Sequence, residues 1–139
     1  MPCDDPRMKE IRTAVLKELS PENTIGGVMR HQTDYYFRAH QELHRNPWII
    51  TTLWLAECDI MNAESEDDLK HVTGYFDWVV QYAQESGILS EQLDPYTGEQ
   101  LSVAPLIWSH AQFVSTIILY LEKLEDLGVC RTCYPLKVR

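Results

Sequence analysis

Two long apolar segments, each starting at a proline, constrain the fold of this chain more than any other feature. The first follows Asn46-Pro47, in which Asn46 is expected to cap the helix, and the second runs from Pro105 to Leu127. Both are apolar over most of the circumference of a helix, and such a helix must be covered on nearly all sides. Proline suits the first helical turn, where its missing N–H costs no hydrogen bond. The sequence therefore predicts two buried helices, the second of which ends at Gly128.

Two further segments are amphipathic. Asp5 followed by Pro6 predicts a helix start, and Ser20 stops the pattern. Ser65 and Asp68 form a capping box for another helix, which we expect to end at Gly87. The apolar stripes of these helices are Met8, Ile11, Val15 and Leu19 in the first, and Leu69, Val72, Phe76, Val79, Val80 and Ala83 in the second.

A long irregular segment precedes each buried helix, at about 21–46 and 88–104. No alternating apolar pattern indicates a sheet, so we predict an all-α protein. If the buried helices form an inner layer and the amphipathic ones an outer layer, both long loops meet at the same rim. A site there would combine Arg30, Asp34 and Glu91, with Trp48 and Trp108 in the first turns of the inner helices.

Composition excludes several partners. The chain has 139 residues, 45% of them hydrophobic, which suits one domain with its own core. The net charge of −9 argues against nucleic acid and anionic membranes, because both need clustered Lys and Arg. The polar start, MPCDDPRMKE, lacks the apolar stretch of a signal peptide. We therefore expect a soluble, cytoplasmic protein with no nucleic-acid or membrane partner.

Neither the cysteines nor the histidines indicate a cofactor. Cys130 and Cys133 form a C-x-x-C pair, but no second pair at ligand spacing accompanies them. A solvent-exposed tail is the simpler interpretation, and half of a zinc or redox site is the alternative. His31, His40 and His44 share one loop without a metal-binding spacing. We therefore expect no metal and no cofactor.

The irregular segment around Glu91 resembles a known active site. GILSEQLDPYTGEQLSVAPLIWSHAQF, residues 87–113, is similar to the last active-site segment of glycoside hydrolase family 15, the glucoamylase and glucodextranase group. The shared features are an apolar residue, Glu-Gln, a D…TGE turn, a serine and a WS(H/Y)A helix start. Upstream, GGVMRHQTDYY and NPWIITTLWLAE resemble the two preceding blocks of the family, so the resemblance covers about residues 24–125.

The resemblance implies a fold and an activity. Members of the family form an (α/α)6 barrel of twelve helices, with the site at the rim where loops enter the inner helices. Residues 1–139 then resemble a single C-terminal portion of such a catalytic domain, a partial (α/α)6 barrel of about four helices. The implied activity is inverting hydrolysis of α-glucosidic bonds in starch-like glucans, dextran or trehalose.

The resemblance also implies roles for individual residues. Glu91 matches the catalytic base, which activates water for attack with inversion at the anomeric carbon. Gln92 sits beside this base and is expected to hold it in place. Arg30 matches an arginine that hydrogen-bonds sugar hydroxyls, and Asp34 an acidic residue that orients the arginine. One departure is His31, where the family more often shows tyrosine.

Two tryptophans complete the predicted substrate site. Trp48 matches a tryptophan at the edge of the sugar subsites, and Trp108 the tryptophan that follows the catalytic loop. His110, next to Trp108, is expected to be a packed, hydrogen-bonded histidine rather than a proton shuttle. Asp94 and Glu99 are expected to shape the turn after the base and to take no catalytic part.

The second carboxylate of the reaction, the general acid, belongs in the family to an earlier segment that this chain does not contain. The isolated chain is therefore expected to be an inefficient catalyst. Its expected partners are an α-glucoside or oligosaccharide, and either an N-terminal portion of the same domain or a second copy of itself. The alternative is a non-catalytic helical module that binds a sugar or a protein.

Overall fold

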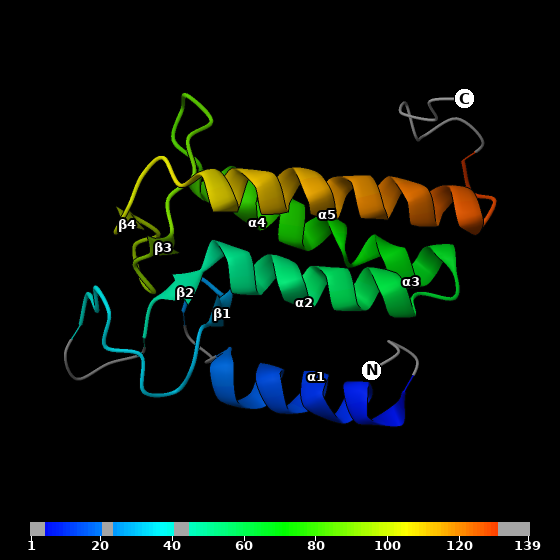
Figure 1. Cartoon of the computed structure of the whole chain (residues 1–139), viewed down its shortest axis with the longest axis horizontal. Helices are drawn as coiled ribbons and strands as arrows, with labels where there is room; N and C mark the ends of the chain where they lie inside the picture. The colour runs from blue at the N-terminus through cyan, green and yellow to red at the C-terminus, as the bar shows by residue number, and fades with distance from the viewer. Residues whose placement is uncertain (1–4, 21–23, 41–44, 131–139) are drawn as a thin grey trace.

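Helices and short strands alternate along the part of the chain that the structure describes. The structure is a computed structural model that describes residues 5–20, 24–40 and 45–130. This part is mostly helical, as predicted, with a small antiparallel sheet that the sequence did not predict (Figure 1). The helices are α1 (Pro6–Leu19), α2 (Ile49–Asn62), α3 (Glu66–Lys70), α4 (Thr73–Tyr82) and α5 (Ile107–Asp126). The strands are β1 (Val28–Met29), β2 (Pro47–Trp48), β3 (Gln92–Leu93) and β4 (Gln100–Leu101).

The long helices lie side by side in two opposite directions. In Figure 1, α2 and α5 run the same way, and α1, α3 and α4 run the other way. The two parallel helices pack along each other, and α4 also contacts α2. As a result, the N-terminal ends of α2 and α5 and the loops that lead into them lie at one end of the molecule (Figure 1).

The sheet joins these loops at that end. Its order is β1-β2-β3-β4, and every neighbouring pair is antiparallel. In the register, Val28 pairs with Trp48, and Trp48 pairs with Gln92. Each strand has only two residues, too short for an alternating apolar pattern, which is why the sequence gives no sign of it.

Helix α1 begins as predicted and lies on the surface. The side chain of Asp5 caps it by accepting a hydrogen bond from the backbone N–H of Arg7. None of its residues is fully buried. Its apolar face lines a groove of about 280 Å³ together with residues of β1 and α2, including Met29 and Trp54.

Helix α2 is buried as predicted but begins later than predicted. Pro47 and Trp48 form β2, and the first helical residue is Ile49. The prediction that Asn46 caps the helix is therefore wrong. Asn46 is buried, and its side chain bonds to Phe37, Ala39 and Gln92 instead. Pairing with β1 and β3 holds Pro47 and Trp48 extended, so the sheet delays the helix start.

The predicted helix from Ser65 to Gly87 is divided and shorter. The capping box forms, because Ser65 accepts a hydrogen bond from the Asp68 N–H and donates one to its carboxylate. Turns closed by hydrogen bonds between residues three positions apart, such as Val72 N–H to the Leu69 carbonyl, then separate α3 from α4. Helix α4 ends at Tyr82 because the side chain of Gln100 donates to the Tyr82 carbonyl at 3.0 Å, and Gly87 lies in the following turn.

The apolar stripe of this predicted helix is only partly internal. Its buried members are Leu69, Val72 and Val79. Val80 is 63% exposed, against the prediction, since the break after Lys70 changes which side of α4 faces the body.

Helix α5 ends as predicted, but it begins at Ile107 rather than at Pro105 and is less buried than predicted. It runs from Ile107 to Asp126, and Gly128 follows with a positive φ of 71°. Only Ser109 and Thr116 are fully buried, and Ile107 is 82% exposed. The prediction of a buried helix is wrong for the described chain, because its other elements cover only one side of α5.

Hydrophobic packing holds α2, α4 and α5 together through two clusters. Leu53 and Val79 belong to the cluster near the sheet, and Ile60 and Leu69 to the one at the far end of α2. Among the residues described, no helix is both long and apolar enough to cross a membrane. Cys130 is disulfide-bonded, which the sequence did not predict. Cys133, the other member of the C-x-x-C pair, lies outside the described residues.

Candidate active site

An ion pair lies in the loop between β1 and β2, at the rim where the sheet forms. Arg30 donates through Nη2 to Oδ1 of Asp34 at 2.8 Å. The Asp34 side chain is 3% exposed, whereas that of Arg30 is 41% exposed. The backbone N–H of Tyr36 also donates to Asp34, at 3.1 Å. The buried carboxylate therefore fixes the arginine from one side and leaves its other donors toward solvent.

Trp48 lies directly beside this ion pair. Its indole Nε1 donates to Oδ2 of Asp34 at 3.1 Å, and the Arg30 guanidinium lies 4.2 Å from the centre of its ring. A cation over an indole face is favourable, so Trp48 and Asp34 together orient Arg30. Trp48 itself is only 5% exposed. In this structure it supports Arg30 and presents little open face to a sugar.

Glu91 lies immediately before β3 and is held by the backbone on both sides. Its N–H donates to the Val103 carbonyl at 3.0 Å, and its carbonyl accepts from the Ile49 N–H at 3.2 Å. Its side chain is partly exposed, and Oε2 accepts a hydrogen bond from Ser102 Oγ at 2.6 Å. Ser102 has a positive φ of 66°, a conformation uncommon for a serine. The carboxylate is therefore fixed in position.

Gln92 connects Glu91 to the rest of the sheet. It is fully buried, and its backbone pairs with Trp48. Its side-chain nitrogen donates to Glu91 Oε2 at 3.4 Å, and its side-chain oxygen accepts from Asn46 at 2.7 Å. The residue after the candidate base thus touches both long loops.

The turn after β3 is built around Asp94. Burial opposes ionisation of this carboxyl group, but hydrogen bonds from the Thr97 and Tyr96 N–H groups and from His40 outweigh it, so the pKa of Asp94 lies below its ordinary value. An ionised, fully bonded carboxylate is a poor proton donor. Asp94 therefore shapes the turn, in agreement with the expectation from the sequence.

The ring contact of Trp108 is with Trp54 rather than with the residues around Arg30. Trp108 is 55% exposed in the first turn of α5, and its ring packs edge-on against that of Trp54 at a centroid distance of 6.0 Å. His110, two residues on, accepts a hydrogen bond from the Leu89 N–H at 3.1 Å. The expectation of a packed, hydrogen-bonded histidine is confirmed.

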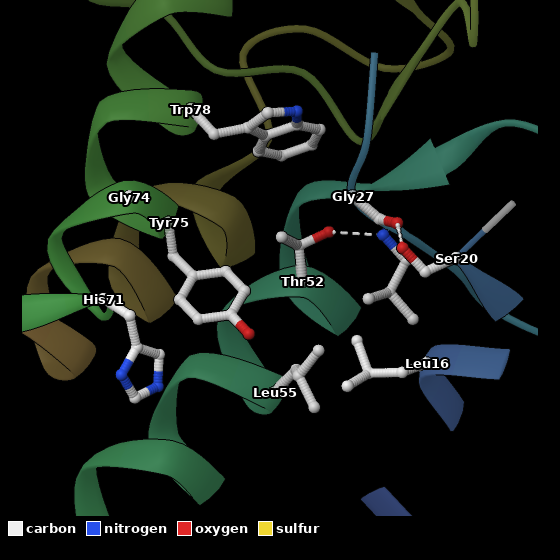
Figure 2. Close-up of a pocket in the computed structure, with 10 residues that line it drawn as sticks. Leu16, Ser20, Gly27, Thr52, Leu55, His71, Gly74, Tyr75 and Trp78 are labelled. Atoms are coloured by element: carbon white, nitrogen blue, oxygen red, sulfur yellow. Dashed lines mark hydrogen bonds between the residues drawn. The ribbon is translucent and has the colours of Figure 1, made fainter. Parts of the chain in front are cut away.

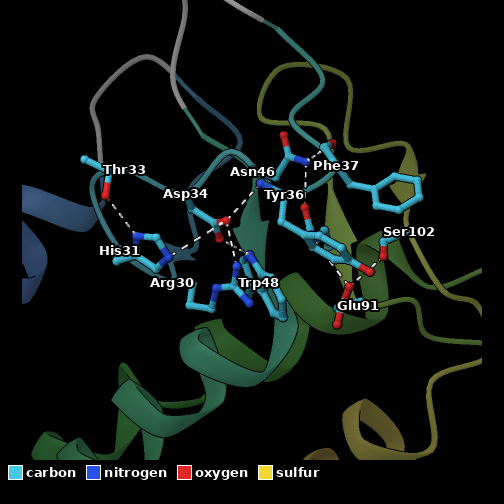
Figure 3. Close-up of polar contacts among 11 residues, drawn as sticks. Arg30, His31, Thr33, Asp34, Tyr36, Phe37, Asn46, Trp48, Glu91 and Ser102 are labelled. Atoms are coloured by element: carbon cyan, nitrogen blue, oxygen red, sulfur yellow. Dashed lines mark hydrogen bonds and ion pairs between the residues drawn. The ribbon is translucent and has the colours of Figure 1, made fainter.

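Figure 3 draws the Arg30 and Glu91 groups together. In that view the ring of Tyr36 lies between the Arg30–Asp34 pair and Glu91, with Phe37 at the edge. Tyr36 and Phe37 are both exposed, although their rings pack edge-on at 5.1 Å. His31 stands at the outer side, with Nε2 4.0 Å from Asp34.

Four residues of the site were not assigned from the sequence: Ser102, Asn46, Tyr36 and Phe37. The serine is part of the quoted motif, and its recurrence there is the signal from which its bond with Glu91 could have been expected. Asn46 resembles a helix cap in sequence, and only the sheet reveals its actual partners.

A separate pocket, open to solvent, lies away from these two groups. It has a volume of about 250 Å³ and lies between α1, α2 and α4, with Thr52, His71, Tyr75 and Trp78 among its lining residues (Figure 2). Its polar side chains are bonded within the protein; Thr52, for example, accepts from the Val28 N–H. Within the described ranges, no cluster of three or more His, Cys, Asp or Glu side chains is arranged to hold a metal ion.

Comparison with known proteins identifies the relationship. The sequence model described as Glycosyl hydrolases family 15 matches residues 61–118, the segment that contains Glu91, Gln92 and Trp108. A protein of Methanocaldococcus jannaschii, named an uncharacterized glycosyl hydrolase, is 35% identical over 120 residues. Over residues 61–118 this chain is therefore similar to the glycosyl hydrolases of family 15.

This chain corresponds to only a small part of the Methanocaldococcus relative. The aligned region takes in 80% of this chain but only 18% of the length of the Methanocaldococcus protein. No solved structure matches the chain. The similarity supports a glycosidase at the level of the family, and the finer assignments depend on the site geometry.

Proposed function

We propose that this chain carries the base side of an inverting glycosidase site that cleaves α-glucosidic bonds, as in the glucoamylase group. The observation that carries the proposal is the position of Glu91. It is a partly exposed carboxylate, held by Ser102 and Gln92 at the rim that also holds Arg30, in a relative of family 15.

The contacts of Glu91 suit a base that activates water. Its two hydrogen-bond donors both reach Oε2. Among the described residues, no hydrogen bond engages Oε1, so that oxygen is available to a water molecule. A general base must lie within hydrogen-bond reach of the proton that it removes, and a fixed carboxylate with one open oxygen meets this condition.

Arg30 is arranged to bind sugar hydroxyls. Asp34 takes one of its nitrogens, and Trp48 supports its plane. The remaining donors of the planar guanidinium suit two neighbouring hydroxyl groups of a glucosyl unit. Arg30 and Asp34 thus form the proposed binding part of the site, with Trp48 as their support.

We further propose that residues 1–139 are one C-terminal portion of an (α/α)6 barrel. The parallel α2 and α5 suit inner helices, and the antiparallel α1 and α4 suit outer ones. The open side of α5 and the greater length of the Methanocaldococcus relative support a covering polypeptide. That N-terminal portion would supply the general acid, with roughly 6.5–9.5 Å between the two carboxyl groups, the spacing typical of inverting enzymes.

Replacing Glu91 tests the proposed function. Glu91→Gln is made in the enzyme assembled from this chain and the N-terminal portion, and hydrolysis of maltose, isomaltose and trehalose is followed by NMR, which also identifies the anomer released. We expect kcat to fall by about 10²–10⁴-fold, the usual contribution of a general base, with ligand binding retained.

Glu99→Gln is the matched control, because Glu99 is an exposed acid in the same hairpin. It should keep its activity. Exogenous azide should restore turnover to Glu91→Ala and yield the inverted glycosyl azide. Retained turnover in Glu91→Gln, or a product of retained configuration, would exclude Glu91 as the inverting base.

The exposed rings of Tyr35, Tyr36 and Phe37 favour a second candidate, a helical module that binds a sugar or a protein without hydrolysis. Aromatic faces are common in sugar recognition and at protein interfaces. Calorimetric binding of a maltooligosaccharide to the assembled protein, without release of glucose, would support this alternative over the enzyme.

A further inference from the structure

Asn46 is a buried side chain at the centre of the candidate site with a complete set of partners. It is 3% exposed. Its Oδ1 accepts from the Ala39 N–H at 3.2 Å. Its Nδ2 donates to the Phe37 carbonyl at 2.7 Å and to the side-chain oxygen of Gln92 at 2.7 Å. One amide therefore connects the loop before β2 with the residue beside Glu91.

The backbone determines which way this amide faces. A backbone N–H only donates and a carbonyl only accepts, so Ala39 requires the Asn46 oxygen and Phe37 requires the Asn46 nitrogen. Reversing the amide would place two donors together and two acceptors together. Both bonds would be lost inside a buried site, which is costly.

The orientation of Asn46 in turn determines that of Gln92. Because Asn46 presents a donor, Gln92 must present its side-chain oxygen to it, and the Gln92 nitrogen then faces Glu91 Oε2. A reversed Gln92 would place its oxygen against the carboxylate and its nitrogen against the Asn46 nitrogen. The Ala39 N–H and the Phe37 carbonyl thus determine the orientation of Asn46. Asn46 determines that of Gln92, and Gln92 then donates to Glu91.

We propose that Asn46 is a positioning residue for Glu91: it fixes the Gln92 amide with its donor toward the carboxylate. The inference rests on the proposed function of Glu91 as the base. The bond from Gln92 is long at 3.4 Å, and such bonds often shorten once substrate is bound. Asn46 touches neither the substrate nor the water in this scheme and acts only through Gln92.

The deciding test needs neither hydrolysis nor substrate. The 139-residue chain is labelled with ¹⁵N in glutamine side chains and ¹³C in glutamate carboxyl groups, and both are followed by NMR as pH is changed. In the unsubstituted chain, the Gln92 side-chain nitrogen should shift with the same midpoint as the Glu91 carboxyl carbon. Asn46→Leu has a similar shape without the donor, and should reduce that response at least twofold.

Asn62→Leu is the matched control. Asn62 lies at the other end of α2, where its amide, within the described ranges, bonds to Cys58 of the same helix. The Gln92 response should be unchanged in this variant. If Asn46→Leu fails to fold, Asn46→Asp keeps the shape and offers only acceptors, so Gln92 should reverse and lose its response to Glu91. A full response in a folded Asn46→Leu or Asn46→Asp chain would overturn the proposal, as would no response in the unsubstituted chain.

Kinetics in the hydrolysing enzyme give a second readout. Asn46→Leu should lower kcat about tenfold, keep KM within about twofold, and move the acidic limb of the pH profile upward. In a Gln92→Met background the same change should have no further effect on that limb, because the residue through which Asn46 acts is gone. An equal effect in both backgrounds would refute action through Gln92.

The two hypotheses fail separately. Retained turnover in Glu91→Gln removes the base assignment but leaves the NMR response intact. A missing NMR response removes the role of Asn46 but leaves Glu91 to be judged by its own variant.

Discussion

Arg12 is predicted to contribute more to stability than the carboxylate that it binds. Arg12, on α1, donates through Nε and Nη2 to both oxygens of Asp59, near the end of α2. The Asp59 side chain is 4% exposed and that of Arg12 33% exposed. Asp59 also accepts from Tyr75 at 3.0 Å and lies 3.3 Å from His71. The Arg12–Asp59 ion pair thus connects α1 to α2, and α1 has no fully buried residue of its own.

The size of each loss of stability follows from the difference in exposure between Arg12 and Asp59. Removing one partner of a buried ion pair costs about 3–5 kcal/mol, because a charge is left buried and unpaired. Arg12 is partly exposed and Asp59 keeps two other partners, so we expect Arg12→Met to cost about 2 kcal/mol. Asp59→Asn removes the buried charge and lets Arg12 turn to water, so we expect about 1 kcal/mol. With a slope of about 2 kcal/mol per molar urea, these costs lower the unfolding midpoint by about 1 M and about 0.5 M.

The pH dependence gives an independent signature. Burial opposes ionisation, but Arg12, Tyr75 and His71 hold the pKa of Asp59 below its ordinary value. The ionised Asp59 carboxylate therefore stabilises the fold fully above its unfolded-state pKa of about 3.9. This stabilisation is lost as pH falls through the lower pKa of the folded state. Without Arg12, burial dominates and raises the pKa of Asp59. The loss of unfolding free energy caused by Arg12→Met should then become smaller as pH is lowered from 7 to 5.

Urea unfolding followed by circular dichroism measures both effects, with Lys9→Met, an exposed cation on the same helix, as control. The reasoning is refuted if Asp59→Asn costs as much as Arg12→Met at pH 7, or if the Arg12→Met defect grows toward pH 5.

Two further changes test the packing. Gly27→Ala should lower the free energy of unfolding by about 2 kcal/mol or more in the same assay. The φ of Gly27 is 82°, and the new Cβ would lie 2.9 Å from the Cβ of Pro47 and closer still to the Trp78 ring. Gly74→Ala is the control and should be tolerated, because there is open space around Gly74. The isolated chain should self-associate through the open side of α5, and Ile107→Lys with Val114→Lys should shift it toward monomer in analytical ultracentrifugation; a parent chain that is already monomeric would contradict this.

Local signals in the sequence predicted the helices well. Asp5 with Pro6, Ser65 with Asp68, and Gly128 each act through bonds to neighbouring residues, so they can be recognised without tertiary structure. The failures have a tertiary cause. Asn46-Pro47 has the local form of a helix start, but Pro47 pairs with Met29, and Trp48 pairs with both Val28 and Gln92, so the two residues stay extended.

The candidate site was predictable only in part. A motif pointed to Glu91 and Gln92 as candidates, and the order of helices and loops predicted that the loop with Arg30 and Asp34 lies at the same rim. The turn at Asp94 was predicted, but the contact of Glu91 with Ser102 depends on pairing of β3 with β4, and two-residue strands are too short for a recognisable pattern. The partners of Asn46 come from three separate segments, beyond the reach of any local signal.

The two-residue strands also limit where the chain can change in length. In the part of the chain that the structure describes, β2 pairs with β3 through Trp48 and Gln92, and α2 begins at the very next residue after Trp48. An insertion between Asn46 and Ile49 would rotate every side chain of α2 relative to Glu91 and Gln92. Inserted residues in the turn at 95–98 would extend the hairpin away from the pair. Variation among related chains should therefore be concentrated in such turns, where the length of the loops can change while Glu91 stays in place.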